Sequence, residues 1–289
     1  MTAEPYSALQ QWLLKGRNAD GGWGYYPGKA TRLEPTCWTM LALKGVVPDS
    51  DLTRVLTEWP VRDGLLAERH GGDPNYAFHA LGLLVLRAFG AEHANANRRL
   101  LTALEHVKGV RIDTRNTRNR QNNQLQGWSW VPETFSWVEP TAWALLTLKK
   151  YGQARETDIA RISEAEMLLL DRACISGGWN YGNSNMLGQE LRPYIPTTAL
   201  AVLALQGREA EPAVARGLAF LEHESVSEPS GFALALAATA LRAMNRSPSA
   251  ALERLVRQLP TTCALANQLA VALSVYALRT DHGDAAFKI

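Results

Sequence analysis

The sequence predicts an all-α fold, an (α/α)6 toroid in which six inner helices are surrounded by six outer ones. Two observations predict it. A Gly-Trp turn followed by an aromatic loop and a proline-led apolar segment occurs three times in the 289 residues, and two kinds of helical segment alternate along the chain. Such repeats bury their apolar faces only against neighbouring units. We therefore expect one toroid domain spanning residues 1–289.

The three copies of the repeat are centred on Trp23, Trp128 and Trp179. Trp23 precedes Pro35 by 12 residues, and Trp128 precedes Pro140 by 12, each time within a Glu-Pro-Thr sequence. In the third copy a longer loop separates the tryptophan from its proline. Glycine permits backbone conformations closed to other residues, so we expect these turns to serve structure, with each tryptophan plugging the end of a helix pair.

One kind of segment is amphipathic and charged. Between residues 157 and 173, for example, Ile159 and Ile162 lie on an apolar stripe while Asp158 and Arg161 lie on the other side. Such helices cover a core with one face and meet solvent with the other. The predicted outer helices are 7–17, 50–59, 91–108, 157–173, 211–224 and 248–258.

The second kind of segment is apolar on nearly all sides, which predicts burial on all sides. Proline suits a first helical turn, where its missing N–H has no intrahelical partner. An α-solenoid shares this helix-pair logic, but its buried helices are more amphipathic and its ends carry polar caps, so we favour the closed ring. The predicted inner helices are 36–44, 75–89, 141–149, 197–206, 230–244 and 261–278, led by Pro35, Pro74, Pro140, Pro196, Pro229 and Pro260. Strand signals are almost absent.

Every connection from an outer to an inner helix lies on one face of such a ring. Four of these connections are long, and three of the four carry aromatic residues, whereas the last two connections are short. Functional residues concentrate on loops held by a rigid scaffold, so we expect the site at this mouth. The long loops are 18–33, 60–73, 109–138 and 176–195.

Composition excludes several classes of function. The net charge of +2 gives no whole-protein field for nucleic acid. Three cysteines lie far apart without a Cys-x-x-Cys pair, which argues against a disulfide framework or a zinc knuckle. The first 14 residues lack the pattern of a signal peptide, and no apolar run approaches the ~20 residues of a membrane span. We expect a soluble, cytoplasmic protein.

The repeat resembles that of a known family. The segment 12–43, with Gly-Gly-Trp-Gly at 21–24 and Pro-Thr-Cys-Trp at 35–38, is similar to the internal repeat of protein prenyltransferase β subunits. It is also similar to the related repeat of squalene and oxidosqualene cyclases, and the match recurs at 128–148 and 179–205. The resemblance implies an α/α toroid over the whole chain and an isoprenoid or similar apolar lipid as its ligand.

The chain departs from these families at their catalytic motifs. The prenyltransferase zinc ligands in His-Thr-Cys-Tyr and Asp-Gly-Cys-Tyr correspond to sequences that place Pro35, Pro140 and Ala142 at ligand positions. Catalytic zinc needs three protein ligands, so we expect no metal and no other cofactor. The Asp-x-Asp-Asp acid of squalene–hopene cyclases and the Asp-Asp-x-x-Asp motif are also absent from the sequence.

Aromatic residues of the loops and helix starts are candidates for a ligand-binding wall. An aromatic cavity suits an apolar or cationic chain through burial and cation–π attraction, and it suits sugars stacked on tryptophan equally well. Ordinary core packing is the alternative for each residue. The candidates are Tyr25, Tyr26, Trp38, Trp130, Trp137, Trp143, Tyr181 and Tyr194.

A basic stretch in the third long loop is a candidate anion site. Arg111, Arg115, Arg118 and Arg120 lie among Asn and Gln residues, and they form either a solvated loop or a cover that holds an anion, with the help of Arg192. The starts of the inner helices converge at the same mouth, where their dipoles favour phosphate.

Glu34 and Glu139 are the candidate catalytic acids, because each directly precedes the proline of an inner helix. A carboxylate at a helix start is stabilised by the dipole, which lowers its pKa, whereas an apolar wall raises the pKa by desolvation. General acids require the raised value. Simple stabilisation of the helix start is the alternative role, and burial decides between the two effects.

Three hypotheses follow for the function. The first is a small, metal-free relative of the terpenoid cyclase and prenyltransferase toroids that binds an isoprenoid and protonates or rearranges it. The second is a carbohydrate-active toroid of the glycosidase or lyase kind, with paired carboxylates in a tryptophan-lined groove. The third is a non-catalytic scaffold whose mouth binds a partner.

Overall fold

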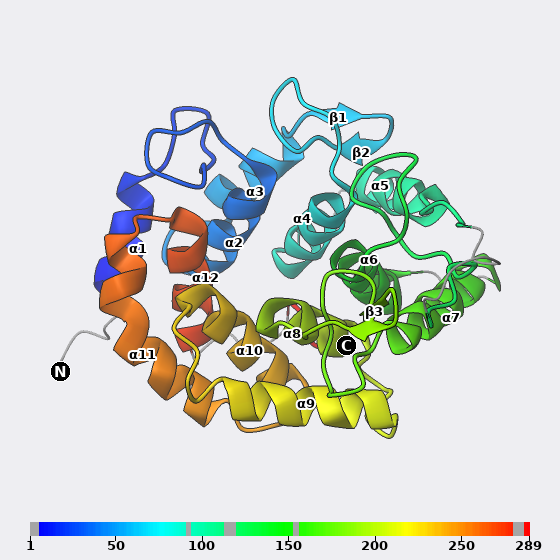
Figure 1. Cartoon of the computed structure of the whole chain (residues 1–289). Coiled ribbons are helices and arrows are strands. Elements are labelled where there is room, and N and C mark those ends of the chain that lie inside the picture. The colour runs from blue at the N-terminus through cyan, green and yellow to red at the C-terminus, as the bar shows by residue number, and fades with distance from the viewer. Residues whose placement is uncertain (1–5, 91–93, 113–119, 153–155, 280–285) are drawn as a thin grey trace.

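The protein forms a double ring of helices in the computed structural model, which describes residues 6–90, 94–112, 120–152, 156–279 and 286–289 (Figure 1). Within these ranges twelve helices alternate between the two layers, which confirms the predicted (α/α)6 toroid. The inner helices are α2 (Leu33–Leu43), α4 (Tyr76–Ala88), α6 (Val138–Tyr151), α8 (Ile195–Ala204), α10 (Gly231–Ala243) and α12 (Gln268–Leu278). The outer helices are α1 (Ser7–Lys15), α3 (Asp49–Thr57), α5 (Ala94–His106), α7 (Glu156–Asp171), α9 (Pro212–Glu224) and α11 (Ser249–Ala264).

The ring of inner helices is closed. Each inner helix packs against the next, and α12 packs back against α2. At one end of this seam the backbone N–H of Gln268 donates to the carbonyl of Tyr25 at 2.7 Å. At the other end Arg279 Nη1 donates to the carbonyl of Ala42 at 2.8 Å. The solenoid alternative, which requires two open ends, is therefore wrong.

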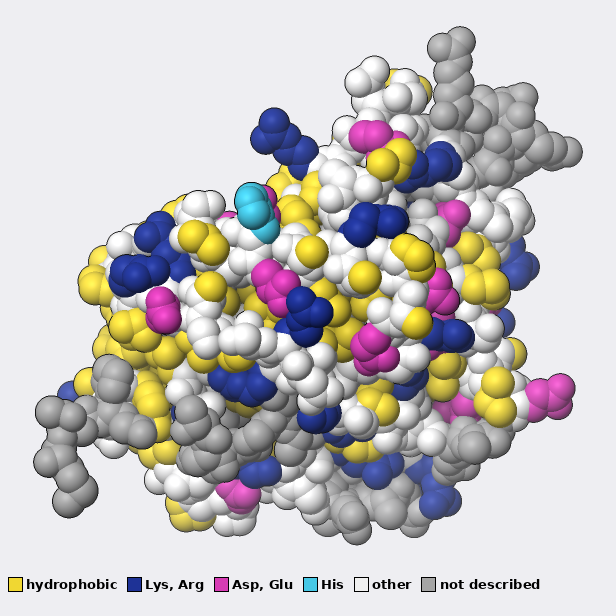
Figure 2. Space-filling model, turned by 90° about the horizontal axis from the view of Figure 1, so that it is seen from below, with side chains coloured by type: hydrophobic (Ala, Val, Ile, Leu, Met, Phe, Trp, Pro, Cys, Tyr) yellow, Lys and Arg dark blue, Asp and Glu magenta, His cyan; other side chains and the backbone are white. Residues whose placement is uncertain are grey.

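Burial follows the two kinds of sequence. All residues of α2 from Pro35 to Leu43 are buried, whereas α3 buries only Leu52, Val55 and Leu56 and exposes its acidic first turn. On the face seen from below, basic and acidic side chains are interspersed with apolar ones (Figure 2). Among the described helices, none has both the length and the apolar character required to cross a bilayer.

Each of the three repeat tryptophans joins one outer helix to the inner helix that follows it in the chain. All three are fully buried, which confirms their structural role. Their backbone N–H groups donate to threonine hydroxyls in the next inner helix at 2.8 to 3.0 Å. Their indole N–H groups donate to carbonyls of the preceding outer helix, Trp23 to Leu13 at 2.7 Å, Trp128 to Leu104 at 2.9 Å and Trp179 to Leu169 at 2.6 Å.

The predicted start of the last inner helix is wrong. Pro260 lies inside the outer helix α11 and is exposed, and α12 begins only at Gln268. Between the two helices Ala266 adopts a left-handed conformation (φ 51°), and the Asn267 side chain accepts a hydrogen bond from the N–H of Ala270 at 3.1 Å. Asparagine is a preferred N-cap residue, so Asn267, rather than a proline, begins the apolar run.

Two small antiparallel hairpins lie in the long loops, where no strand was expected. They are β1 (Val61–Arg62) with β2 (Leu65–Leu66), and β3 (Asn185–Met186) with β4 (Gln189–Glu190). In each hairpin the two turn residues have positive φ, Asp63 and Gly64 in the first, Leu187 and Gly188 in the second. An Asp-Gly pair favours this type of turn, so the first hairpin has a local signal in the sequence.

Candidate active site

A cavity of about 240 Å³ lies at the end of the ring where the inner helices begin. All six inner helices contribute to its wall, together with two loop residues. The wall therefore depends on complete closure of the ring. The residues that line the cavity are Glu34, Trp38, Phe78, Trp130, Glu139, Trp143, Tyr181, Pro196, Leu200, Phe232, Leu236 and Leu269.

Helical geometry explains why most of these side chains share one space. Residues four apart lie on the same face of a helix, and four inner helices present such a pair from their first turns. In two repeats the pair combines a carboxyl with an indole, and in the other two it is wholly apolar. The pairs are Glu34 with Trp38, Glu139 with Trp143, Pro196 with Leu200, and Phe232 with Leu236.

Glu34 is the second residue of α2 and accepts a hydrogen bond from the hydroxyl of Tyr25 at 2.7 Å. Burial raises the pKa of the Glu34 carboxyl to about 7. The hydrogen bond from Tyr25 opposes this rise, and the charge of Glu68 adds to it. Burial, together with the charge of Glu34, also raises the pKa of Tyr25, so its hydroxyl stays protonated as the donor.

Glu139 is the second residue of α6 and lies at the matching place in the second repeat. Burial raises the pKa of its carboxyl to about 8, and the charge of Glu34 adds to the rise, while a hydrogen bond from the Trp143 indole opposes it. Both glutamates are at helix starts, where the dipole favours the anion. Desolvation prevails over the dipole at both, so at neutral pH Glu139 is mainly a neutral acid.

The aromatic part of the wall is formed by rings packed edge to face. Trp38 and Trp143, whose centroids are 6.1 Å apart at 63°, connect the first and second repeats. Phe78 and Trp130, 5.9 Å apart at 70°, form the neighbouring part of the wall. Edge-to-face packing directs ring edges at faces and holds the indoles in place.

A second, shallower depression of about 610 Å³ lies outside the cavity at the mouth. Of the residues expected to bind a ligand, Trp137, Tyr181, Tyr194 and Arg192 line it. Tyr181 also lines the inner cavity, and its ring lies 5.5 Å from that of Tyr194. Tyr181 therefore lies at the boundary between the inner cavity and the outer depression.

The other candidate residues lie elsewhere. Tyr25 reaches the site through Glu34, whereas Tyr26 is 47% exposed and lines neither space. Arg111 donates to the carbonyl of Gln124 and lies 3.7 Å from Glu164, and Arg120 lies 3.2 Å from Glu190. Arg115 and Arg118 are outside the described residues.

The sequence did not lead us to the part of the cavity wall that is formed by phenylalanine, proline and leucine side chains. These residues occupy the first two turns of their inner helices, as Trp38 and Trp143 do. The position within the repeat, rather than aromatic character, is the signal that would have found them. The missed residues are Phe78, Pro196, Leu200, Phe232, Leu236 and Leu269.

The residues at the prenyltransferase zinc positions do not fit a zinc ion. Pro35, Pro140 and Ala142 offer no ligand atom, and Cys37 is fully buried with its thiol pKa raised by burial and by the charge of Glu34. A cysteine that binds zinc does so as a thiolate, and the surroundings of Cys37 favour the neutral thiol. Within the described ranges, no three His, Cys, Asp or Glu side chains are grouped to hold a metal.

Comparisons with known proteins give likeness in structure alone. No protein-family profile matches the chain, and no curated protein matches its sequence. Among solved structures, one match is the type II terpene cyclase MstE from Scytonema, in complex with its substrate geranylgeranyl dihydroxybenzoate. The TM-score is 0.61 at 14% identity, and the match covers 97% of this chain and 96% of that one.

Two further structures show the same ring. MstE in complex with merosterolic acid A as product matches with a TM-score of 0.59 at 15% identity, covering 94% of each chain. A reducing-end-xylose releasing exo-oligoxylanase matches with a TM-score of 0.57 at 13% identity, covering 100% of this chain and 95% of that one. The resemblance to terpenoid cyclase toroids is therefore confirmed at the level of the fold.

Proposed function

We propose that the protein binds an apolar isoprenoid chain in the inner cavity and that Glu139 donates a proton to one of its double bonds, without a catalytic metal. One observation carries the proposal. Two carboxyls with raised pKa values line a cavity whose other walls are almost entirely aromatic and aliphatic. This arrangement supplies a proton, a hydrophobic surface and little else.

The proposed step is an isomerisation that needs no co-reactant. The O–H bond of Glu139 breaks, and the π electrons of the double bond form a new C–H bond, which leaves a cation on the neighbouring carbon. Rearrangement or ring closure moves the charge along the chain. Loss of a proton from a carbon next to the cation forms a new double bond, and the carboxylate of Glu34 accepts that proton.

A carboxyl with a pKa of about 8 is a weak acid, so the cation it creates must be stabilised. The indoles of Trp38 and Trp143 line the same cavity, and aromatic faces attract cations by ~2 kcal/mol or more when water is excluded. The carboxylate left on Glu139 adds the attraction of an opposite charge. These interactions grow only as charge develops, which is the requirement for catalysis.

The mouth suits the polar end of the ligand. Arg192 lines the outer depression and is exposed there, next to Tyr194 and Trp137. A diphosphate or carboxylate head at Arg192 would leave the chain to pass Tyr181 into the cavity. The MstE structures support the proposal, because a protein of the same fold forms a complex with a geranylgeranyl compound as its substrate.

The carbohydrate alternative also has support, since an exo-oligoxylanase shares the fold and two carboxyls line the cavity. A sugar requires hydrogen-bond partners for each of its hydroxyls. Apart from Glu34, Glu139 and Tyr181, with the indole N–H groups of the tryptophans, the cavity wall is apolar. We therefore favour the isoprenoid chain.

Incubation with isoprenoid alcohols and diphosphates in D₂O tests the proposal. Proton transfer from solvent-exchanged Glu139 would leave a deuterium on carbon in a product isomeric with the substrate, which mass spectrometry detects. Tryptophan fluorescence measures binding in parallel. Tighter binding of xylo-oligosaccharides would favour the carbohydrate alternative, and chain binding without deuterated product would favour a non-catalytic scaffold.

A further inference from the structure

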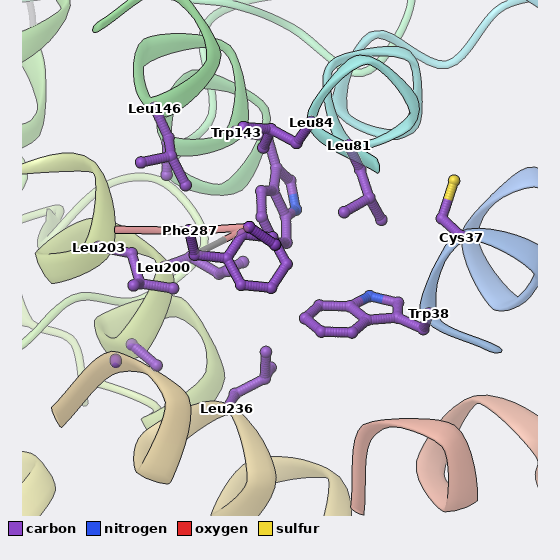
Figure 3. Packing of buried hydrophobic residues seen from close by; sticks show 14 of the residues in the cluster. Cys37, Trp38, Leu81, Leu84, Trp143, Leu146, Leu200, Leu203, Leu236 and Phe287 are labelled. Carbon is purple, nitrogen blue, oxygen red and sulfur yellow. The ribbon is translucent and has the colours of Figure 1, made fainter. Parts of the chain in front are cut away.

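Residues 286–289 form the floor of the ring. Ala286 is 5% exposed and Phe287 is fully buried, although helix α12 ends before them at Leu278. Phe287 lies at the centre of the barrel among side chains from several inner helices, with Trp38, Trp143 and Leu236 around it (Figure 3). This segment therefore contributes to the core without being part of either ring of helices.

The segment enters from the end opposite the carboxyls. Its hydrogen-bond partners lie at or just after the last residues of inner helices, whereas Glu34 and Glu139 lie at the first. Gln206, after α8, donates to the carbonyl of Phe287 at 2.8 Å and accepts from the N–H of Ile289 at 3.1 Å. Lys150 of α6 donates to the carbonyl of Lys288 at 2.5 Å.

The Phe287 ring contacts the residues that line the cavity. Its centroid lies 5.2 Å from that of Trp38 and 5.7 Å from that of Trp143, and both indoles line the cavity. Tyr276, near the end of α12, packs against Phe287 at 5.6 Å. The ring thus fills the space directly behind two indoles of the cavity wall.

We propose that Phe287 sets the maximum length of the chain that the cavity accepts, an inference that rests on the proposed function. A dry apolar cavity of ~150 Å³ holds benzene, so by proportion the cavity of about 240 Å³ holds on the order of ten carbon atoms. Two isoprene units, as in geraniol, fill this space. A longer chain needs the space beyond the two indoles, which Phe287 fills.

Calorimetric titration with prenol, geraniol, farnesol and geranylgeraniol tests the proposal. Each buried methylene strengthens binding on the order of fourfold, so affinity for the wild type should rise steeply from prenol to geraniol and then stop rising. In Phe287→Ala the rise should continue to farnesol, which we expect to bind at least ~10-fold more tightly than to the wild type. Phe287→Leu should lie between the two.

Phe89→Ala is the matched control, because Phe89 follows the last residue of α4 at the same end of the ring and its ring packs against Lys44 rather than against the two indoles. It should leave the length preference unchanged. A preference for geraniol that persists in both Phe287 variants would overturn the role of Phe287 alone. Equal affinity of the wild type for all four alcohols would overturn the proposed function, and the inference with it.

Discussion

The same three residues, Glu-Pro-Thr, lie in the first turns of α2 and α6, yet the two carboxyls have different surroundings. Glu34 is held by a tyrosine from the preceding loop, and its pKa is about 7. Glu139 has an indole from its own helix as partner and the charge of Glu34 beside it, and its pKa is about 8. The repeat determines where each carboxyl lies, and the non-repeated neighbours determine its affinity for a proton.

Replacing Glu139 should have its largest effect on turnover, and this tests whether the two carboxyls differ in function. Glu139→Gln keeps the shape and removes the acid, so we expect turnover to fall roughly 10²–10⁴-fold with chain affinity nearly unchanged. Glu133→Gln, an exposed change in the preceding loop, is the control and should retain full activity. Gas chromatography of the product measures turnover in the wild type and in both variants. Full activity in Glu139→Gln would leave Glu139 with a role at the helix start only.

Stability should depend on pH through the same carboxyl. The pKa of Glu139 is raised from 4.5 to about 8 by folding, so its favourable contribution is complete below pH 4.5 and is lost as pH rises through 8. Relative to Glu139→Gln, the wild type should lose a few kcal/mol of unfolding free energy across this range. Urea unfolding at several pH values measures it. A pH-independent difference would contradict the assignment.

The structural part of the repeat should behave alike in both copies. The hydroxyls of Thr36 and Thr141 each accept from a tryptophan N–H at 3.0 Å and donate to the carbonyl of the same tryptophan. Valine in either place leaves buried polar groups unpaired, which costs about 1–3 kcal/mol of unfolding free energy. Thermal unfolding of Thr36→Val and Thr141→Val should give similar losses. A large difference between the stability losses of the two variants would show that the two repeats are not structurally equivalent.

The smallest expected effect is a change in the pKa of Glu34, and it tests directly why the pKa values of the two carboxyls differ. Tyr25→Phe removes the hydrogen bond that lowers the pKa of Glu34, so the pKa of Glu34 should rise towards that of Glu139. Tyr26→Phe, a change at an exposed neighbour, is the control. Carbon-13 NMR of labelled glutamate carboxyls follows both titrations. An unchanged Glu34 titration would show that the hydrogen bond has no part in setting its proton affinity.

Periodicity was enough to predict the ring, because a helix buried on all sides differs in composition from one that is half exposed. It also placed both glutamates and both indoles at the mouth, since their repeats share one spacing. The start of α12 was missed because Pro260 imitates the prolines of the other repeats. The position of Phe287 had no local signal, because it depends on contacts with helices that are distant in the sequence.

The seam between the first loop and the last inner helix has a consequence for how the protein folds. The hydrogen bond from Gln268 to Tyr25 joins positions 25 and 268, and contacts between such distant residues carry a large loop-closure cost and slow folding. Gln268 also donates through its side chain to the carbonyl of Gly24 at 3.0 Å. The wall beside Glu34 is therefore complete only when these distant segments are paired, and we expect amide hydrogen exchange to find this seam among the first parts of the ring to open.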